Sequence, residues 1–558
     1  MHHTHHRRRL RRLAACTTFA LGMGLVSAGQ VPTAAAAPAA PAAVSATASA
    51  KPRFDRDGDG RSDRVYRSAA TGKLTIILSK TGGTPFTIGD DDLNSVISEE
   101  ILPADDVWRA DGIQELLTLR SDGTLRLHAG VSPTETDKGT VWQGGGWQIY
   151  NKVLAPGDLT KDGHQDLLAR TQAGTLYLFP GKGSVDYRGP FAPRIAIGGG
   201  WQIYDQLVGT NDLDGDAIAD IVARTPAGDL YFYKGTGSAT APFKPRVRIG
   251  GGWNTYNQVI GADDLNGDGR GDLLARTYSG TYYQYLSIGG GKFGARTYFG
   301  GGGQNLSYYL GQGGVPAYGK HNVFAVNWAG TAYTYGTQAD GRFGPAKPYG
   351  GAGENAHYGR MTNGYGLDEA DRAMVLTASN PGLMSDRGGE VSSSAAFYNY
   401  AETLSPGDVT FDGEGDVLGL DAWGNLFLHP GLKDYPQRVG AGVKVATGLR
   451  ADQLVATGDV TGDGRPDLIS RDGDRLYVHR GTGSATAPFA ARALIGAGWS
   501  AYEHLAAPGD MDGDGRADLI AVTPGGDVYR YKATGLPGGP VFAPRVKVAG
   551  GWAYMHLS

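Results

Sequence analysis

The sequence is short of cysteine, of long apolar runs and of helical periodicity. Its 558 residues include one cysteine, Cys16, so no disulfide can form within a single chain. No segment keeps an apolar period of 3.6 residues, and the 90 glycines argue against long helices, because a glycine inside a helix costs about 1 kcal/mol. Beyond residue 26 no apolar run is long enough to cross a bilayer. These absences exclude a coiled coil, and no membrane span is expected.

An excess of positive charge is also missing. The chain has 52 Lys and Arg residues against 56 Asp and Glu residues, a formal net charge of −4. A nucleic-acid partner is therefore not expected, because binding to phosphates needs a basic surface. The sequence also lacks a Gly-x-Ser-x-Gly elbow, a His-Glu-x-x-His zinc motif and a Walker loop. We assign no catalytic residue.

The N-terminal segment has the pattern of an export signal. An Arg-rich stretch precedes an apolar run at 13–26 that is too short to span a bilayer. Small residues that suit cleavage follow at 34–36 or, as the alternative, at 26–28. We interpret residues 1–36 as a secretion signal peptide and the Ala/Pro-rich residues 37–52 as a linker. The mature protein is expected to be secreted and extracellular.

The main feature that is present is a repeat of about 51 residues. Ten units cover residues 53–558, as repeats 1–5 over 53–305 and repeats 6–10 over 306–558, the first two of the second set being degenerate. Each unit is marked by one residue directly before an apolar run, at intervals of 45 to 54 residues. The markers are Asp63, Glu115, Asp166, Asp220, Asp272, Asn322, Asp371, Asp416, Asp467 and Asp518. We expect no separate catalytic domain, because the repeats leave no stretch for one.

Each unit predicts four short strands. In the third unit we expect them at 166–170, 174–179, 194–197 and 201–208, bounded by Gly-rich turns. Four short strands in about 50 residues are typical of a propeller blade. We therefore predict an all-β fold, a β-propeller of about ten four-stranded blades. Two rings of five blades are favoured over one large ring.

The two ends of the repeat array predict how it closes. Phe54 stands directly before an acidic loop, with no preceding Trp-x-x-Tyr segment, and residues 552–557 supply such a segment at the other end. We expect this C-terminal strand to complete the blade begun at the N-terminus, since closure removes exposed sheet edges. Residues 379–401 are expected to form a loop.

Seven units carry a loop of the pattern Asp-x-[Asp/Asn/Thr]-x-Asp-Gly-x-x-Asp, in which the sixth residue is usually Gly. Oxygen side chains at positions 1, 3 and 5 of a tight loop can converge on one point, and Ca²⁺ takes six to eight oxygen ligands. Position 9 is expected to close the site before the next strand. The predicted ligands are Asp55, Asp57, Asp59, Asp63, Asp158, Thr160, Asp162, Asp166, Asp212, Asp214, Asp216, Asp220, Asp264, Asn266, Asp268, Asp272, Asp408, Thr410, Asp412, Asp416, Asp459, Thr461, Asp463, Asp467, Asp510, Asp512, Asp514 and Asp518.

These loops predict up to seven Ca²⁺ sites. Asp and Gly also make good turns, so one such loop alone would be weak evidence. Seven loops in one register favour calcium, because their carboxylates would otherwise repel one another in a small space. The pattern is not an EF-hand, which needs Glu at position 12 and flanking helices. Three units depart from it, with Glu115 and Asp111, with Asn322, and with Asp371 and Asn363, and we expect them to be empty.

Trp and Tyr recur at the same place before the acidic loop in four of the units. The residues are Trp147, Tyr150, Trp201, Tyr204, Trp253, Tyr256, Trp499 and Tyr502. Packing between sheets is the favoured interpretation, because buried aromatic rings contribute large apolar areas. The alternative is that exposed rings stack on sugars, with one site per blade.

These repeats resemble the FG-GAP or VCBS-type repeat of secreted bacterial proteins and of integrin α-chain propellers. The name of the family is echoed in Phe293-Gly294-Ala295 and Phe343-Gly344-Pro345. The resemblance covers nearly the whole chain after the linker. It implies propeller blades with calcium in the seven loops named above, and members that serve mostly as binding and scaffold modules.

We therefore expect a secreted, calcium-binding β-propeller that acts as a non-catalytic binding or adhesion scaffold. Its partner is expected to be an extracellular glycan or protein, and the protein itself a monomer. The alternative is a propeller-fold polysaccharide lyase or hydrolase, with active-site residues gathered from distant loops.

Overall fold

The computed structural model describes residues 50–68, 73–79, 86–87, 98–108, 112–120, 123–129, 139–171, 173–277, 279–303, 306–313, 322–337, 341–349, 361–364, 374–378, 383–385, 390–412, 414–432, 438–512, 516–536 and 539–558. The expected signal peptide, all but the end of the expected linker, and Asp111, Asp371 and Asp514 lie outside these residues. Within them the protein is all-β and contains ten four-stranded antiparallel sheets and two two-stranded ones.

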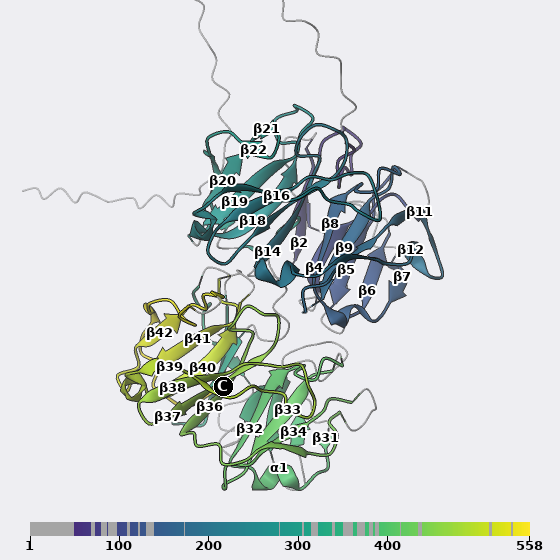
Figure 1. Cartoon of the computed structure of the whole chain (residues 1–558). Coiled ribbons are helices and arrows are strands. Elements are labelled where there is room, and N and C mark those ends of the chain that lie inside the picture. Colours follow the sequence, from purple (N-terminus) through teal and green to yellow (C-terminus); the bar gives the residue numbers. More distant parts are fainter. Residues whose placement is uncertain are drawn as a thin grey trace, which may run out of the picture. The chain divides into compact units, whose positions relative to one another are not determined.

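One sheet shows the plan of all ten (Figure 1). It contains β8 (Tyr150–Gly157), β9 (Asp166–Thr171), β10 (Leu176–Phe179) and β13 (Ile195–Gly198), in the spatial order β13-β10-β9-β8. The first five residues of β9 are all buried, whereas β10 alternates between buried and half-buried positions. The second strand of the unit therefore lies inside the core, and the pattern becomes more polar toward the outer strand.

The remaining strands repeat this order. Four more sheets are β24 (Leu306–Tyr309)-β1 (Arg64–Ser68)-β2 (Leu74–Ile77)-β3 (Phe86–Thr87), β4 (Ser98–Pro103)-β5 (Leu116–Arg120)-β6 (Leu125–His128)-β7 (Thr140–Gly144), β14 (Gln206–Asn211)-β15 (Asp220–Arg224)-β16 (Leu230–Tyr233)-β17 (Val247–Gly250) and β18 (Tyr256–Asp263)-β19 (Asp272–Thr277)-β20 (Tyr282–Tyr285)-β23 (Thr297–Gly300). Five further sheets are β27 (Lys347–Tyr349)-β26 (Ala332–Gly336)-β25 (Asn322–Asn327)-β44 (Tyr554–Leu557), β28 (Met361–Gly364)-β29 (Met374–Ala378)-β30 (Leu383–Ser385)-β31 (Glu390–Ser392), β32 (Glu402–Gly407)-β33 (Asp416–Leu420)-β34 (Leu426–His429)-β35 (Val443–Ala446), β36 (Gln453–Gly458)-β37 (Asp467–Asp472)-β38 (Arg475–His479)-β39 (Ala493–Ala497) and β40 (His504–Gly509)-β41 (Asp518–Val522)-β42 (Val528–Tyr531)-β43 (Val546–Ala549).

Short elements complete the fold. The two small hairpins are β11 (Gly181–Asp186) with β12 (Gly189–Phe191) and β21 (Ser287–Gly289) with β22 (Lys292–Phe293). The single-turn helices are η1 (Trp147–Ile149), η2 (Trp201–Ile203), η3 (Trp253–Thr255), η5 (Trp499–Ala501) and α1 (Ala396–Asn399). Within the described parts of the chain, no helix combines the length and apolar character needed to cross a membrane.

Two local predictions are wrong. The strand expected at 201–208 begins as η2, and β14 starts only at Gln206. Gly200, with φ of 91°, turns the chain into this 3₁₀ turn and lets Trp201 N donate to Gly174 O at 3.0 Å. Residues 379–401 are not simply a loop, since they contain β30, β31 and α1.

The expected closure by the C-terminal strand is also wrong. β44 pairs with β25, where Ala325 faces Leu557, while the N-terminal strand β1 pairs with β24, where Tyr66 faces Tyr309. The sequence could not decide between these partners, because β24 and β44 both follow Gly-rich junctions and have similar short apolar patterns. No described sheet combines strands from 64–309 with strands from 322–557.

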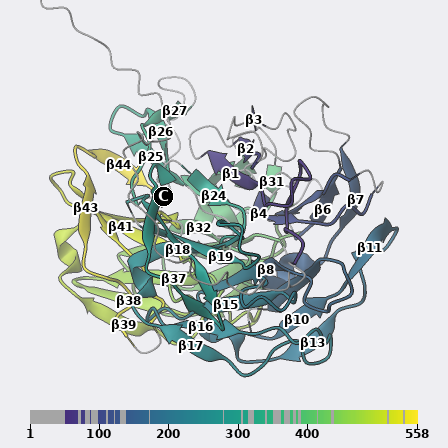
Figure 2. The same cartoon turned by 90° about the horizontal axis from the view of Figure 1, so that it is seen from above.

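The first strands of neighbouring sheets contact one another in series. β8 contacts β14, and β14 contacts β18 (Figures 1 and 2). In the C-terminal half the contacts run from β25 through β28, β32 and β36 to β40, which contacts β25 again. Polar side chains of these strands link the sheets: Gln206 Nε2 donates to Asn257 O at 2.6 Å, and Gln206 Oε1 accepts from Val259 N at 2.7 Å.

Aromatic wedges fill the junctions between sheets. Trp201 is 7% exposed, and its ring centroid lies 4.6 Å from that of Tyr233 in the next sheet. The hydroxyls of Tyr204 and Tyr233 are hydrogen bonded at 2.7 Å. Trp147, Trp253, Trp499 and Trp552 are buried in the same way. This burial supports packing as the role of the Trp-x-x-Tyr segment and leaves no ring face free to stack on a sugar.

Candidate metal centres in the acidic loops

Six of the seven acidic loops connect the first strand of a sheet to the second, whereas the loop at 55–63 leads into β1, whose neighbour β24 comes from residues 306–309. In the loop between β8 and β9, Asp158 Oδ1 accepts a hydrogen bond from Asp162 N at 3.1 Å and Asp158 Oδ2 accepts one from Gly163 N at 2.8 Å. Asp162 Oδ1 in turn accepts from His164 N at 3.0 Å. These bonds curl the loop around the carboxylate at position 1, so the loop shape follows from its own acidic side chains.

Two positions of the loop need a left-handed backbone. In the first loop both are glycine, Gly58 with φ of 68° at position 4 and Gly60 with φ of 83° at position 6. Other loops hold Lys161 or Phe411 at position 4 and Ala217 at position 6, all with φ of about 60° and all strained for a residue with a Cβ. The expected sharp turn at position 6 is confirmed, whereas the equal need at position 4 was missed.

The carboxylate at position 9 is engaged by backbone N–H groups on both sides. Asp166 Oδ2 accepts from Leu159 N at 2.8 Å and from Thr160 N at 2.9 Å, while Asp166 Oδ1 accepts from Gly181 N at 2.9 Å. The degenerate second unit keeps part of this arrangement, since Glu115 Oε2 accepts from Val107 N at 2.7 Å. This residue therefore fixes the loop in place, a role that the sequence pattern did not reveal.

Three of the seven loops bring three carboxylates together. Their nearest oxygens lie within 4.8 Å of one another in the clusters Asp55–Asp57–Asp63, Asp212–Asp214–Asp220 and Asp510–Asp512–Asp518. In the remaining four loops, no such trio of carboxylates is found among the residues described. Three of those four have Thr at position 3, namely Thr160, Thr410 and Thr461, and the fourth has Asn266.

Unsatisfied oxygens at position 3 fit a cation. Asp214 Oδ1 and Thr160 Oγ1 are buried and have no hydrogen-bond partner within the described structure. A buried oxygen without a partner costs about 1–3 kcal/mol. Ca²⁺ binds such oxygens from carboxylates and neutral groups, so the donor set of these loops suits this ion.

The electrostatics of the loops favour a positive charge. Burial, and then the neighbouring Asp214, raise the pKa of Asp220 to about 8. Burial also raises the pKa of Asp166 and Asp416 to about 7 and that of Asp272 to about 6, and nearby carboxylates add to each shift. The raised pKa values mean that the ionised forms of these carboxylates are disfavoured. A divalent cation bound in the loop would favour the ionised forms.

Basic side chains compete for two of the three clusters. Lys234 Nζ pairs with Asp214 and, at 2.8 Å, with Asp216. Arg530 Nη1 lies 2.7 Å from Asp512, and Lys532 Nζ lies 3.0 Å from the same carboxylate. A cation entering these loops must displace or share these partners, so the seven loops are not equivalent.

The fold and these loops define an all-β repeat protein whose unit is a four-stranded sheet with an acidic loop. Comparison with protein families places FG-GAP-like repeats at residues 212–275 and 459–521. Each match begins at the first Asp of one acidic loop and ends in the strand that follows the next loop. FG-GAP-like repeats are therefore present at these two places, as the sequence pattern indicated. No curated protein matches the chain.

Proposed function

We propose that the chain is a secreted β-propeller protein that binds Ca²⁺ in its acidic loops and acts as a non-catalytic scaffold for a carbohydrate or protein ligand. The observation that carries this proposal is the clustering of three carboxylates in each of three acidic loops, beside which the pKa of Asp220 is raised. FG-GAP-like repeats support the scaffold role. Secretion rests on the Arg-rich and apolar pattern of residues 7–26.

Two five-bladed rings are the architecture that the strand pairing supports. β24 pairs with β1 and β44 pairs with β25, so each half of the repeat array would be closed by a strand from its own end. The contacts from β25 round to β40 and back to β25 fit a ring of five sheets. On this proposal the first ring extends through β24, slightly beyond the boundary at residue 305.

Calcium would act on stability through the loops. In the loop of Asp212, the carboxylates of Asp212, Asp214 and Asp220 and further oxygens would hold the ion. Since the chain has one cysteine, bound calcium would take the place that disulfides hold in many exported proteins.

Metal content tests the proposal. The chain from residue 37 onward, purified in Ca²⁺ and then dialysed against metal-free buffer, should retain several equivalents of calcium when measured by plasma mass spectrometry. Retention of less than one equivalent would contradict calcium binding. A glycan array and incubation with a panel of polysaccharides address the ligand, and release of new reducing ends or unsaturated products would favour the lyase or hydrolase alternative.

A further inference from the structure

The junction between the sheet β32–β35 and the sheet β36–β39 lacks a tryptophan. At an intact junction, Trp201 N donates to the carbonyl of Gly174, in the turn of the preceding sheet, at 3.0 Å. Leu449 N donates to Gly424 O in the same way at 2.9 Å. The backbone therefore places Leu449 where the other junctions have the indole.

The tyrosine that accompanies the tryptophan at intact junctions is missing from this junction as well. At the intact junction, Asp205, which follows Tyr204, donates its backbone N–H to Arg224 O in the second strand, β15, at 2.9 Å. Asp452 N makes the corresponding bond, to Arg471 O at 2.7 Å. Ala451 thus takes the place of Tyr204, and a Leu/Ala pair stands where the other junctions hold an indole and a phenol.

Two other junctions that lack tryptophan within the described residues keep an aromatic filling. Ahead of β32, Phe397 packs with its ring centroid 4.3 Å from that of His429, and Tyr400 Oη is hydrogen bonded to His429 Nε2 at 2.9 Å. Ahead of β24, the tryptophan position is Gly303, and a Cβ there would lie 2.5 Å from the ring of Tyr282. The loss at Leu449 has no such compensation.

Leu449 and Arg450 line a cavity of about 590 Å³ at this junction. Pockets that bind small ligands typically have volumes of about 300–1,000 Å³. Its apolar walls include Leu468, Pro488 and Phe489, and its charged residues are Arg450 and Arg492. We refer to this cavity, defined by these five residues, as the wedge pocket.

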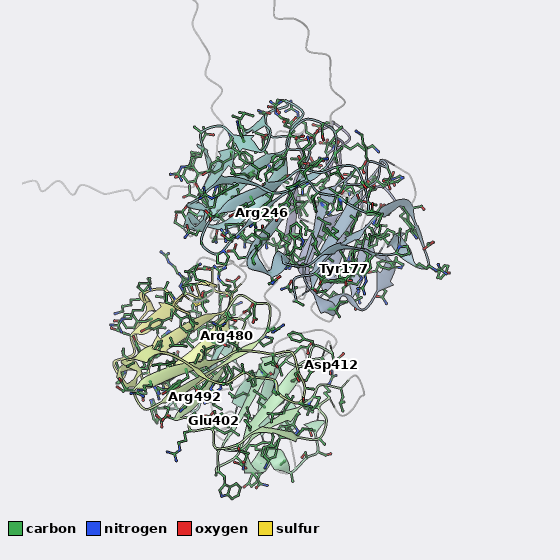
Figure 3. All side chains as sticks on the ribbon, in the orientation of Figure 1. Tyr177, Arg246, Glu402, Asp412, Arg480 and Arg492 are labelled. Carbon is green, nitrogen blue, oxygen red and sulfur yellow. The ribbon has the colours of Figure 1, made fainter. Side chains whose placement is uncertain are left out.

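Arg492 is a pre-oriented cation of the wedge pocket (Figure 3). Its guanidinium lies 4.2 Å from the ring centroid of Tyr477, as that of Arg246 lies 4.4 Å from Tyr231 in an intact sheet. Arg246 also donates to the hydroxyl of Tyr204. Ala451 offers no hydroxyl at the corresponding place, so this junction has the stacked guanidinium without its usual partner from the wedge.

A carboxylate suits the charged part of the pocket. Arg492 pairs with Asp472 at 3.3 Å, but both side chains are more than a third exposed, and such pairs are weak. Arg450 is exposed. Guanidinium groups bind carboxylates through parallel hydrogen bonds and also stack on rings. In the turn that holds Leu449, Trp423 is 82% exposed and directly precedes Gly424.

We propose that the wedge pocket binds a ring that carries a carboxylate, with the ring against Leu468 and Phe489 and the carboxylate at Arg450 and Arg492. This chemistry has two sources, a uronic acid unit of an acidic polysaccharide and a free aromatic acid. The proposal deepens the proposed scaffold function by naming a ligand class. It does not depend on calcium, so the two can fail separately.

Calorimetric titration of the calcium-saturated chain from residue 37 onward tests the proposal with four probes. They are indole-3-acetate, indole, trigalacturonate and the neutral maltotriose. One acid at least should bind about tenfold or more tightly than its neutral counterpart. Binding of trigalacturonate alone identifies the polysaccharide source, and binding of indole-3-acetate alone identifies the aromatic acid. If neither acid binds at about 10 mM, or if neutral probes bind as well as acids, the proposal is overturned.

Variants locate the site. Leu449→Trp should place an indole in the part of the pocket where the ligand ring would lie and so abolish binding. Arg450→Gln should weaken acid binding about tenfold without affecting the fold, since Arg450 is exposed. Arg246→Gln, which removes the counterpart of Arg492 at an intact junction, should leave binding unchanged. Acid binding that survives both Leu449→Trp and Arg450→Gln overturns the proposal. A calcium-dependent melting temperature measured on the same samples reports on the proposed function independently.

Discussion

Asp166 and Gly181 are joined by a 2.9 Å hydrogen bond from the Gly181 backbone N–H to the Asp166 carboxylate, across the hairpin of β9 and β10. The same bond recurs between Asp220 and Gly235, between Asp416 and Gly431 and between Asp467 and Gly481. The last acidic residue of the pattern therefore holds each acidic loop against the far end of the next hairpin. It couples the loop to the sheet whether or not a metal is bound.

Asp166→Ala should destabilise the protein even without calcium. The substitution removes the acceptor of three N–H groups, and each buried group left without a partner costs about 1–3 kcal/mol, so we expect a loss of about 3 kcal/mol in EDTA. Asp162→Asn keeps the Oδ1 acceptor and should change the stability in EDTA by less than about 0.5 kcal/mol while reducing the calcium content. Urea denaturation measures both. Equal losses in the two variants would contradict the separate role of position 9.

Ala217→Gly should stabilise the protein. Ala217 has φ of 62°, a conformation that costs a residue with a Cβ about 1–2 kcal/mol, and the greater freedom of Gly in the unfolded chain offsets part of this gain. We expect a net increase of about 0.5 kcal/mol in the free energy of unfolding. The matched control is Gly163→Ala at the same loop position, where φ is 93° and a Cβ would meet nothing within 4 Å. It should lose about 1 kcal/mol through the backbone alone. A stabilised Gly163→Ala variant would refute this explanation.

Glu402→Gln should remove a pH dependence of stability. Burial raises the pKa of Glu402 to about 7, and its Oε2 is buried without a hydrogen-bond partner in the described structure. Because the folded pKa exceeds the unfolded value of 4.5, the stabilisation from this group is full below pH 4.5 and is lost as the pH rises through about 7. Gln fits this setting, since Gln453 both donates to Leu505 O at 2.9 Å and accepts from Leu505 N at 3.1 Å at the corresponding place in β36.

The two proteins should therefore differ at high pH. At pH 8 the Glu402→Gln variant is expected to be more stable by about 3 kcal/mol, and at pH 4 the difference should vanish. Urea denaturation across this range measures the effect. A difference that is the same at pH 4 and pH 8 would show that Glu402 does not titrate with folding.

Trp201→Leu should reproduce the Leu449 junction at an intact site. Removing most of a buried indole leaves a cavity, and we expect a loss of about 2–4 kcal/mol in the free energy of unfolding. Indole added at saturating concentration should recover part of the loss, because a ligand that binds only the folded state stabilises it. Differential scanning calorimetry with and without indole provides the measurement, with the unmodified protein as control. No recovery would mean that the sheets close over the missing ring.

Local patterns were sufficient for the repeated parts of this fold. Alternating apolar residues and Gly turns placed β9 and β10 within one or two residues, and the Asp spacing placed the acidic loops. The burial of the tryptophans followed from their recurrence at one place in several units. All of these depend on interactions within about 50 residues, where sequence spacing corresponds to distance in space.

Features that depend on distant partners were not predictable. The pairing of β44 with β25 connects residues more than 200 positions apart, and several Gly-rich junctions offer similar short strands. The hydrogen bonds that Asp166 accepts from backbone N–H groups could not be predicted from the sequence pattern, because every residue except proline carries such a donor. The sequence alone did not show that Leu449 takes the place of a tryptophan. The hydrogen bond from Leu449 N to Gly424 O identifies it as the counterpart of the tryptophans at the other junctions.

Calcium dependence of the melting temperature tests the central claim most directly. Stripped with EDTA and then titrated at pH 7.5 with Ca²⁺, the chain from residue 37 onward should gain stability with each addition, because the ion binds the folded loops alone. The melting temperature should rise by several degrees at about 100 times the dissociation constant, where binding contributes about 2.7 kcal/mol per site. Mg²⁺ should be a poor substitute, since it demands a tighter octahedral shell. A melting temperature that is identical in EDTA and in millimolar Ca²⁺ would contradict the account.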